Sequence, residues 1–459
     1  MEATFFKRGA VTCHLTMPPP KSLSIFLLLA TAASAAVTRV ELVDRADLLA
    51  GEPQGAAGAY ERIVAKAYFA VDPKLAPNQI IADLALAPRN DQGLVEYSAD
   101  VFILKPRDPA KGNGTALVEI SNRGGKGLLS TFDFASGSRD PRSPPDFGDR
   151  FLLKQGFTLV WIGWEFDVPA SPTALRLYAP IATDNGKPIT GMVLSEWIGD
   201  KMVKAISLGD RDQVAYPLAD GNAPGTQLSV RDHIKSERKI IPRSQWKFSD
   251  DTHVTFDQGF EPGRIYEVVY QAKDPVVVGL GPAAIRDFVS FLKYGGPETL
   301  LGDQSLTLKR ALAFGVSQSG RFLREYLYDG FNQDEKSRKV FDGVWAHVAG
   351  AGRGSFNFRF AQPSRDGHPF LNVMYPTVRR GRVAGARDER QRRAQGVSYQ
   401  RILRVLGPCG VPDPHFAGRQ AGCAAQPQRA NLLFRGIAAW DRKHPAAESG
   451  SAKFGRHHR

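Results

Sequence analysis

Gly-Val-Ser-Gln-Ser-Gly at residues 315–320 is the stretch of sequence that decides the fold. A short apolar run comes directly before it, and residues 321–328 carry apolar side chains on one face of a helix. A strand, a tight turn and a helix form a nucleophile elbow, in which a serine takes a strained backbone conformation and the residues two positions away on either side are small. Gly315 and Ser319 meet this steric demand, although glycine is usual where Ser319 stands. The stretch predicts Ser317 as a nucleophile.

An elbow also needs two hydrogen-bond donors for the negative oxygen that forms when the serine attacks a carbonyl group. The backbone N–H of Gln318, at the start of the helix, is in position to be the first donor. The second comes from a loop after an earlier strand, and residues 121–127 form such a loop, rich in glycine. Asn122 and Arg123 are therefore the candidate residues for the second oxyanion-hole donor.

Both segments have an alternative interpretation. The elbow stretch also fits an ordinary strand-to-helix turn in which Ser317 only caps the helix. The loop at residues 121–127, with its glycines and Lys126, also fits a phosphate-binding loop, but it lacks the spacing of the Walker and dinucleotide-binding patterns. The strand before the elbow, the amphipathic helix after it and the parallel strands expected around it favour the elbow.

Apolar runs of strand length alternate with helical periodicity around the loop and the elbow. This alternation is typical of an open, mainly parallel sheet. We expect an α/β fold of the α/β-hydrolase type at residues 111–377, with a cap-like insertion of short strands at about residues 165–263. A β-rich segment, residues 36–110, precedes this core.

The formal charge of +13 is concentrated at the C-terminal end. Residues 378–459 contain 17 Lys and Arg against 5 Asp and Glu, and 15 of those cations are Arg, whereas the rest of the chain is close to neutral. These arginines have no recognisable fold or interleaved aromatic residues around them, so we expect no nucleic-acid partner. The apolar residues of this tail show no sustained period, which predicts an irregular or disordered segment.

Metal and cofactor sites are not indicated by the sequence. Cys13, Cys409 and Cys423 are the three cysteines, and no two of them have the spacing of metal ligands or of a redox pair. No cofactor-binding motif is present in the chain. We expect neither a metal nor a cofactor.

Residues 1–35 are typical of an upstream extension followed by a secretory signal. Lys21 precedes an apolar run at residues 23–30, and Ala-Ser-Ala at residues 33–35 offers the small side chains of a cleavage site. The alternatives are a buried strand of the mature fold and a membrane-spanning helix, for which the run is too short. We expect cleavage before Ala36, a secreted or periplasmic protein, and no membrane contact after cleavage.

Several segments resemble the secreted "alpha/beta hydrolase domain-containing" proteins, a largely uncharacterised family. They are residues 315–324, 341–351 and 353–357, together with Asn-Arg-Gly at residues 122–124. The resemblance covers about residues 37–376 and implies hydrolysis of a small-molecule ester through an acyl-enzyme. In that family, a later Tyr-Glu-Tyr-Trp-Gly-Arg segment and a Gln-His-Gly-x-Gly segment are expected to supply the catalytic acid and histidine. Neither segment occurs after Pro376.

A frameshift would explain both the missing segments and the arginines of the tail. Suitable codons for residues 403–416, read one nucleotide out of frame, give Tyr-Glu-Tyr-Trp-Gly-Arg. Codons for residues 438–442, read in the same shifted frame, give Gln-His-Gly-Thr-Gly. GC-rich codons read out of frame also yield many arginines. We interpret the chain from about residue 378 onward as a frameshift product.

Serine attack requires a base, and His347 is the histidine with motif context, at the end of the strand expected after the elbow helix. It could line the site, although a structural role suits it better than that of general base. Three hypotheses follow from the residues: an exported serine ester hydrolase that is impaired in this chain, an acyltransferase of the same fold that excludes water, and a catalytically inactive scaffold. The sequence carries no signal for the natural acyl group or for the oligomeric state.

Overall fold

The computed structural model of the chain describes residues 36–209, 213–233, 235–295, 308–349 and 354–365. The expected signal segment, residues 1–35, and the Arg-rich tail, residues 378–459, lie outside these described residues. In the part of the chain that the structure describes, no helix is long and apolar enough to cross a membrane.

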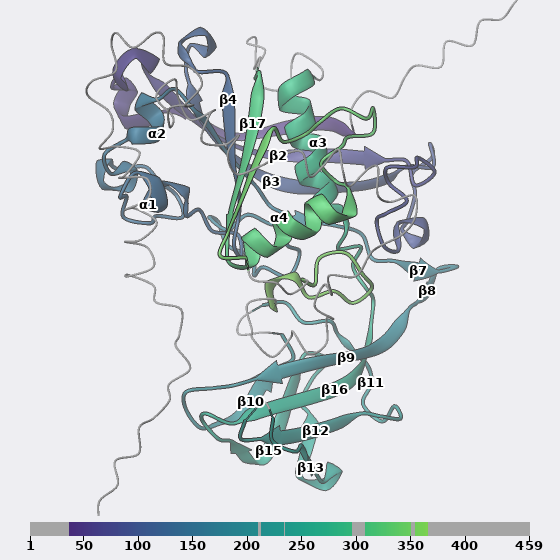
Figure 1. Cartoon of the computed structure of the whole chain (residues 1–459). Helices are drawn as coiled ribbons and strands as arrows, with labels where there is room; N and C mark the ends of the chain where they lie inside the picture. The colour runs from purple at the N-terminus through teal and green to yellow at the C-terminus, as the bar shows by residue number, and fades with distance from the viewer. Residues whose placement is uncertain (1–35, 210–212, 234, 296–307, 350–353, 366–459) are drawn as a thin grey trace, which may run out of the picture. The chain divides into compact units, whose positions relative to one another are not determined.

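The main sheet combines strands of the N-terminal segment with strands of the core (Figure 1). Its strand order is β1-β2-β3-β5-β4-β17-β18, and β6 pairs with β3. The strands are β1 (Val37–Asp47), β2 (Tyr60–Val71), β3 (Val95–Pro106), β4 (Thr115–Ile120), β5 (Thr158–Ile162), β6 (Leu177–Tyr178), β17 (Arg310–Val316) and β18 (Gly343–His347). The four strands β5, β4, β17 and β18 run parallel to one another.

The sheet as a whole is mixed, so the expectation of a mainly parallel sheet is correct only for the core strands. Strands β1, β2, β3 and β6 pair antiparallel, and β3 pairs with β5 from Val101↔Ile162 to Leu104↔Leu159. This pairing satisfies the backbone N–H and C=O groups along an edge of β5 that would otherwise lack partners. The β-rich N-terminal segment therefore extends the core sheet.

Helices cover both faces of the parallel strands. They are α1 (Leu128–Phe132), α2 (Phe151–Lys154), α3 (Leu280–Tyr294) and α4 (Gln318–Asp329). Apolar side chains of α3 and α4 share one buried cluster with the sheet, and those of α1 and α2 share another. Every residue of β4 and β5 is buried, as expected for strands covered on both faces.

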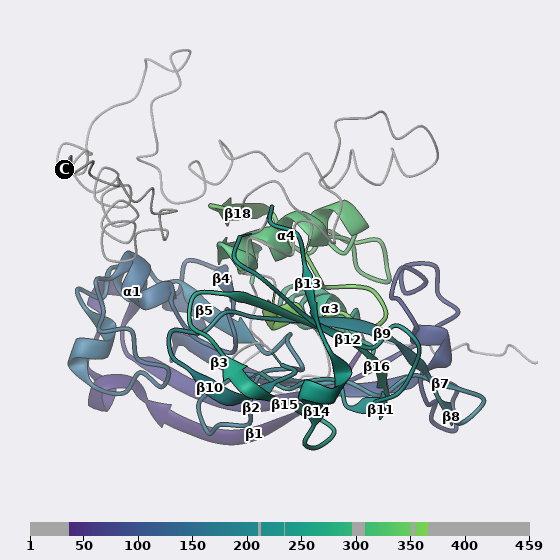
Figure 2. The same ribbon diagram turned by 90° about the horizontal axis from the view of Figure 1, so that it is seen from below.

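The insertion forms a β-rich unit with an apolar core of its own (Figure 2). Its strands are β7 (Thr183–Asp184), β8 (Lys187–Pro188), β9 (Thr190–Trp197), β10 (Val203–Ser207), β11 (Leu218–Asp220), β12 (Gln227–Arg231), β13 (Lys239–Ile241), β14 (Trp246–Phe248), β15 (His253–Phe260) and β16 (Ile265–Lys273). Strand β16 pairs with β9, β11 and β12. The insertion therefore continues to Lys273, beyond the expected end at about residue 263, because its most highly paired strand lies there.

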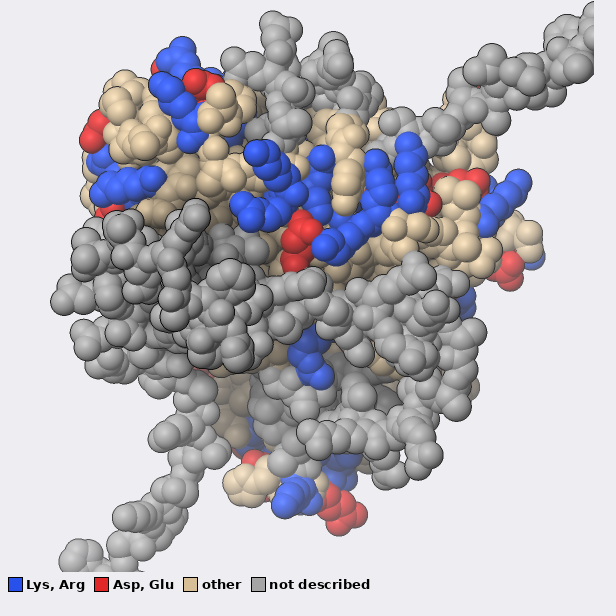
Figure 3. Space-filling view, turned by 45° about the horizontal axis from the view of Figure 1, so that its top comes forward, with Lys and Arg blue, Asp and Glu red and all other residues tan. Residues whose placement is uncertain are grey.

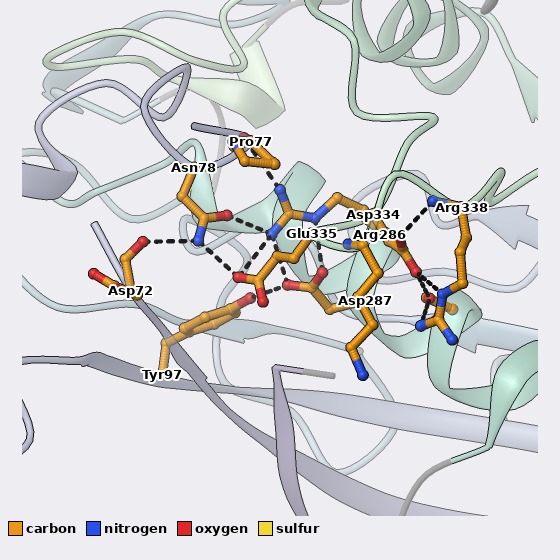
Figure 4. Close-up of polar contacts among 11 residues, drawn as sticks. Asp72, Pro77, Asn78, Tyr97, Arg286, Asp287, Asp334, Glu335 and Arg338 are labelled. Carbon is orange, nitrogen blue, oxygen red and sulfur yellow. Dashed lines mark hydrogen bonds and ion pairs between the residues drawn. The ribbon is translucent and has the colours of Figure 1, made fainter. Parts of the chain in front are cut away.

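A buried charge network packs between α3, β3 and two loops (Figure 4). The Arg286 guanidinium is fully buried and donates hydrogen bonds to Asp287 at 2.7 Å and to the Asn78 side chain at 2.7 Å. The Tyr97 hydroxyl lies 3.5 Å from Asp287, and Glu335 lies 3.8 Å from Arg286. Because buried charges are stable only when paired, this network ties residues that are far apart in sequence.

Cations gather in a band on one face of the described part of the chain (Figure 3). Acidic residues stand beside several of them in the same view. Lys293 and Lys339 both form ion pairs with Asp342, at 2.9 and 3.0 Å. The expectation that nucleic acid is not a partner stays a prediction.

Candidate active site

Ser317 occupies the turn between β17 and α4, as the elbow pattern predicted. Its backbone angles are φ 57° and ψ −111°, which a residue with a side chain adopts only under strain. An ordinary N-cap serine has an extended backbone and accepts a hydrogen bond from its own helix. The Ser317 side chain makes no such capping bond. This geometry favours the elbow over the simple turn.

Two glycines let the strand and the helix approach each other closely. A Cβ at Gly315 would lie 2.6 Å from the Ser319 carbonyl oxygen, and a Cβ at Gly320 would lie 2.6 Å from the His347 carbonyl oxygen. The Ser319 side chain is buried, and its Oγ has no hydrogen-bond partner among the described residues. On the helix side, the residue that must lack a side chain is therefore Gly320, one position later than the sequence suggested. This explains why a serine fits at position 319.

Gln318 begins α4, where backbone N–H groups have no acceptor within the helix. The backbone N–H of Gln318 is the group that the sequence predicts as the first oxyanion donor. The Gln318 side chain is buried, and its Nε2 donates to Glu165 Oε1 at 2.9 Å and to the Pro363 carbonyl oxygen. The side-chain amide thus anchors the start of the helix to two other segments.

The loop at residues 121–127 follows β4, which pairs in parallel with β17. The carboxyl ends of these neighbouring strands lie at one edge of the sheet, so the loop and the elbow emerge at the same edge (Figure 1). Asn122 is exposed, and Arg123 is half-buried with a positive φ of 49°. The Arg123 guanidinium donates to Asn122 Oδ1 at 2.9 Å and to the Ser364 carbonyl oxygen.

The phosphate-binding alternative for this loop has little support in the geometry. The Lys126 ammonium is buried and donates to the carbonyl oxygens of Arg139 and Thr173. The backbone N–H groups of Gly127 and Leu128 donate to the Glu119 carboxylate, at 2.9 and 2.7 Å. The groups that would bind a phosphate are therefore engaged by the protein itself.

His347 ends β18, and its backbone carbonyl accepts a hydrogen bond from the Ser317 N–H at 3.0 Å. Its half-buried ring lies 6.0 Å from the ring of Trp345, centroid to centroid. His233 is exposed, and His253 pairs with Asp250 in the insertion. Among the described histidines, His347 is thus the one adjacent to the elbow. The histidines at residues 14, 368, 415, 444, 457 and 458 lie outside the described residues.

Glu165 and Asp167 are site residues that sequence reasoning missed, because residues from 165 onward were assigned to the insertion. Both are buried just beyond the carboxyl end of β5. Burial, and then the nearby Asp167, raise the pKa of Glu165 well above its usual value. Burial raises the pKa of Asp167 to about 6, although its carboxylate accepts hydrogen bonds from the Ser364 hydroxyl and N–H at 2.7 and 3.0 Å. The sequence feature that could have identified Glu165 and Asp167 is a pair of acidic residues at alternate positions directly after a buried strand.

No group of three or more His, Cys, Asp or Glu side chains in the described ranges is arranged to hold a metal ion. The polar side chains near the elbow are amide, hydroxyl and carboxyl groups together with Arg123 and the His347 ring. Such a set can orient a carbonyl substrate and stabilise charge on it.

Comparison with known families places the elbow in a recognised domain. Residues 237–391 match the family model described as "Alpha/beta hydrolase domain", and this segment includes Ser317 and His347. The resemblance noted in the sequence is confirmed at this level: the matched segment is similar to the domain that defines the alpha/beta hydrolase domain-containing proteins. No curated protein and no solved structure matches the chain.

Proposed function

We propose that the protein is a serine hydrolase that cleaves carboxylic esters through an acyl-enzyme, with Ser317 as the nucleophile. The observation that carries the proposal is the positive φ of Ser317 at a strand-to-helix turn, where the serine hydroxyl does not cap its own helix. Strain of this kind is retained at functional sites, and an elbow uses it to present the serine at the edge of the sheet. The hydrolase domain of the family supports the same reaction class.

The oxyanion that forms during attack would be bound by two segments. The first donor in this proposal is the backbone N–H of Gln318, which has no acceptor within α4. The second is the loop at residues 121–127, at Asn122 or Arg123, because β4 and β17 bring their carboxyl ends together. Each donor of this type contributes roughly a hundredfold to a thousandfold in rate.

We propose that the chain as written is impaired. The nucleophile needs a base that is itself oriented by a carboxylate, and the ring of His347, the described histidine beside the elbow, meets the Trp345 ring edge-on at 6.0 Å between centroids. The segments expected to supply the acid and the histidine are missing from the sequence after Pro376. The frameshift interpretation accounts for that loss and is tested by the codons of residues 375–378.

Ester turnover tests the proposed function. The chain as written should hydrolyse short-chain nitrophenyl esters slowly or not at all, whereas a chain with the reading frame restored should hydrolyse them and lose that activity on Ser317→Ala. Loss of the base typically removes several orders of magnitude in rate. Robust turnover by the chain as written would mean that His347 or another group serves as the base. Turnover that survives Ser317→Ala would reject the nucleophile.

Export is part of the proposal and has its own test. The signal-like residues before Ala36 predict a mature chain that begins near that residue. N-terminal sequencing of secreted material should find this start. A secreted chain that still carried residues 23–30 would contradict it.

A further inference from the structure

A buried carboxyl group, Glu165, lies between the two segments proposed to bind the oxyanion. On one side, Glu165 Oε1 accepts a hydrogen bond from Gln318 Nε2 at 2.9 Å. On the other side, the backbone N–H groups of Arg123 and Gly124 face the carboxyl group and favour its ionised form, although Glu165 Oε2 makes no hydrogen bond within the described residues. Glu165 is therefore hydrogen-bonded to the residue that follows Ser317 and faces backbone N–H groups of the loop at residues 121–127.

The neighbouring contacts hold the same two segments. Trp164 Nε1 donates to the Ser121 carbonyl oxygen at 2.6 Å, so the residue before Glu165 fixes the start of the loop. A Cβ at Gly124 would lie 2.8 Å from the backbone of Leu175, which leaves the loop little freedom there. The loop, the end of β5 and the elbow thus form one packed unit, and Glu165 is its buried polar centre.

The charges that face Glu165 are those of Asp167 and Arg123. Burial and Asp167 disfavour the ionised carboxylate, whereas Arg123 and the loop N–H groups favour it. A neutral glutamine at this position keeps an acceptor oxygen for Gln318 and keeps the side-chain volume. Alanine removes the acceptor and leaves the buried Gln318 amide without it.

We propose that Glu165 is a positioning residue for the oxyanion hole: it holds Gln318 and the loop at residues 121–127 in the relative placement that the reaction requires. This inference rests on the proposed function, because it assigns the role of these two segments. It also makes a structural statement of its own, namely that Glu165 restricts the motion of both segments together.

Hydrogen–deuterium exchange on the full-length chain tests the structural statement without any turnover. Glu165→Ala should raise amide exchange in peptides that cover residues 121–127 and 317–320, and Glu165→Gln should restore protection close to that of the wild type. Glu267→Gln is the matched control, because Glu267 is a buried glutamate that pairs with Arg231 inside the insertion. It should leave both peptides unchanged. Equal exchange in the wild type and in Glu165→Ala would overturn the proposal.

Acylation of Ser317 by nitrophenyl acetate, followed by intact mass in the chain with the reading frame restored, tests the functional statement. We expect Glu165→Ala to lower the acylation rate constant by about tenfold or more, while the ester concentration that gives half of the maximal acylation rate stays unchanged. The rate constant of Glu165→Gln should lie within about threefold of that of the unsubstituted chain. A wild-type rate in Glu165→Ala would overturn the role in the oxyanion hole. A frame-restored chain that is never acylated would reject the proposed function instead, and the role in the oxyanion hole with it, while the exchange experiment still decides whether Glu165 restricts the two segments.

Discussion

The backbone N–H of Ser317 donates a hydrogen bond to the backbone carbonyl of His347 at 3.0 Å. This bond joins the elbow to the end of the neighbouring strand β18, so the sheet supports the strained turn in addition to the bond from the Arg321 N–H to the Ser317 carbonyl oxygen at 2.9 Å. The His347 carbonyl oxygen is also the atom that a Cβ at Gly320 would strike. The conformation of Ser317 and the identity of residue 320 are therefore linked.

Gly320→Ala should destabilise the protein by about 1–3 kcal/mol, because the new Cβ would lie 2.6 Å from the His347 carbonyl oxygen and push the helix from the strand. The urea midpoint measures this loss. Ser319→Ala is the matched control: its Oγ is buried without a partner in the described part of the chain, so its removal should cost much less. A Gly320→Ala variant as stable as Ser319→Ala would show that the helix can move away at little cost.

Arg286→Met should cost about 3–5 kcal/mol, because it leaves the buried Asp287 carboxylate without its partner. Arg359→Met is the control, since Arg359 also pairs with an aspartate, Asp83, but is 44% exposed. Exposed ion pairs contribute roughly 0–1 kcal/mol. Chemical denaturation of both variants measures the difference, and similar losses would contradict the importance of burial.

Glu119→Ala should loosen the loop at residues 121–127, because it removes the acceptor for the N–H groups of Gly127 and Leu128. A buried donor left without its acceptor costs about 1–3 kcal/mol. Exposed Glu96, on β3, provides the control in Glu96→Ala. Amide exchange in the loop peptide should rise in the first variant only, and protection equal to the wild type in Glu119→Ala would refute this role.

The stability of the fold should fall as the pH rises from about 5 to about 7.5. Burial raises the pKa of Glu119 from 4.5 to about 7, so the folded state holds this proton more tightly than the unfolded state. The stability that this proton contributes is complete below the unfolded pKa and is lost as the pH rises through the folded pKa. Glu119→Gln cannot titrate, and its urea midpoint should change less between these pH values. An identical change in both proteins would show that Glu119 is not responsible.

Much of the elbow was predictable because its constraints are local. The spacing of Gly315 and Ser317, the strand before them and the helix after them all lie within one short segment, and the structure places β17 and α4 as expected. Buried strands such as β4 were visible as apolar runs for the same reason. The need for glycine at position 320 could not be predicted from the sequence, because it depends on the carbonyl oxygen of His347, which lies on another strand.

Other features depend on contacts between distant residues. Glu165 and Gln318 are 153 positions apart, and Asp167 and Ser364 are 197 positions apart, so no local period connects them. The antiparallel pairing of β3 with β5 was missed because apolar alternation identifies a strand but not its partner or direction. The insertion extends to Lys273 because β16 pairs with strands that precede it by many residues.

The central claim is that Ser317 is the nucleophile, and the site of covalent modification by a fluorophosphonate tests it most directly. Peptide mass mapping should find one adduct, on the peptide that contains Ser317, in the chain as written and at a faster rate in the chain with the reading frame restored. The adduct should disappear in Ser317→Ala and persist in Ser319→Ala. An adduct that survives Ser317→Ala, or no adduct in either chain, would contradict the account.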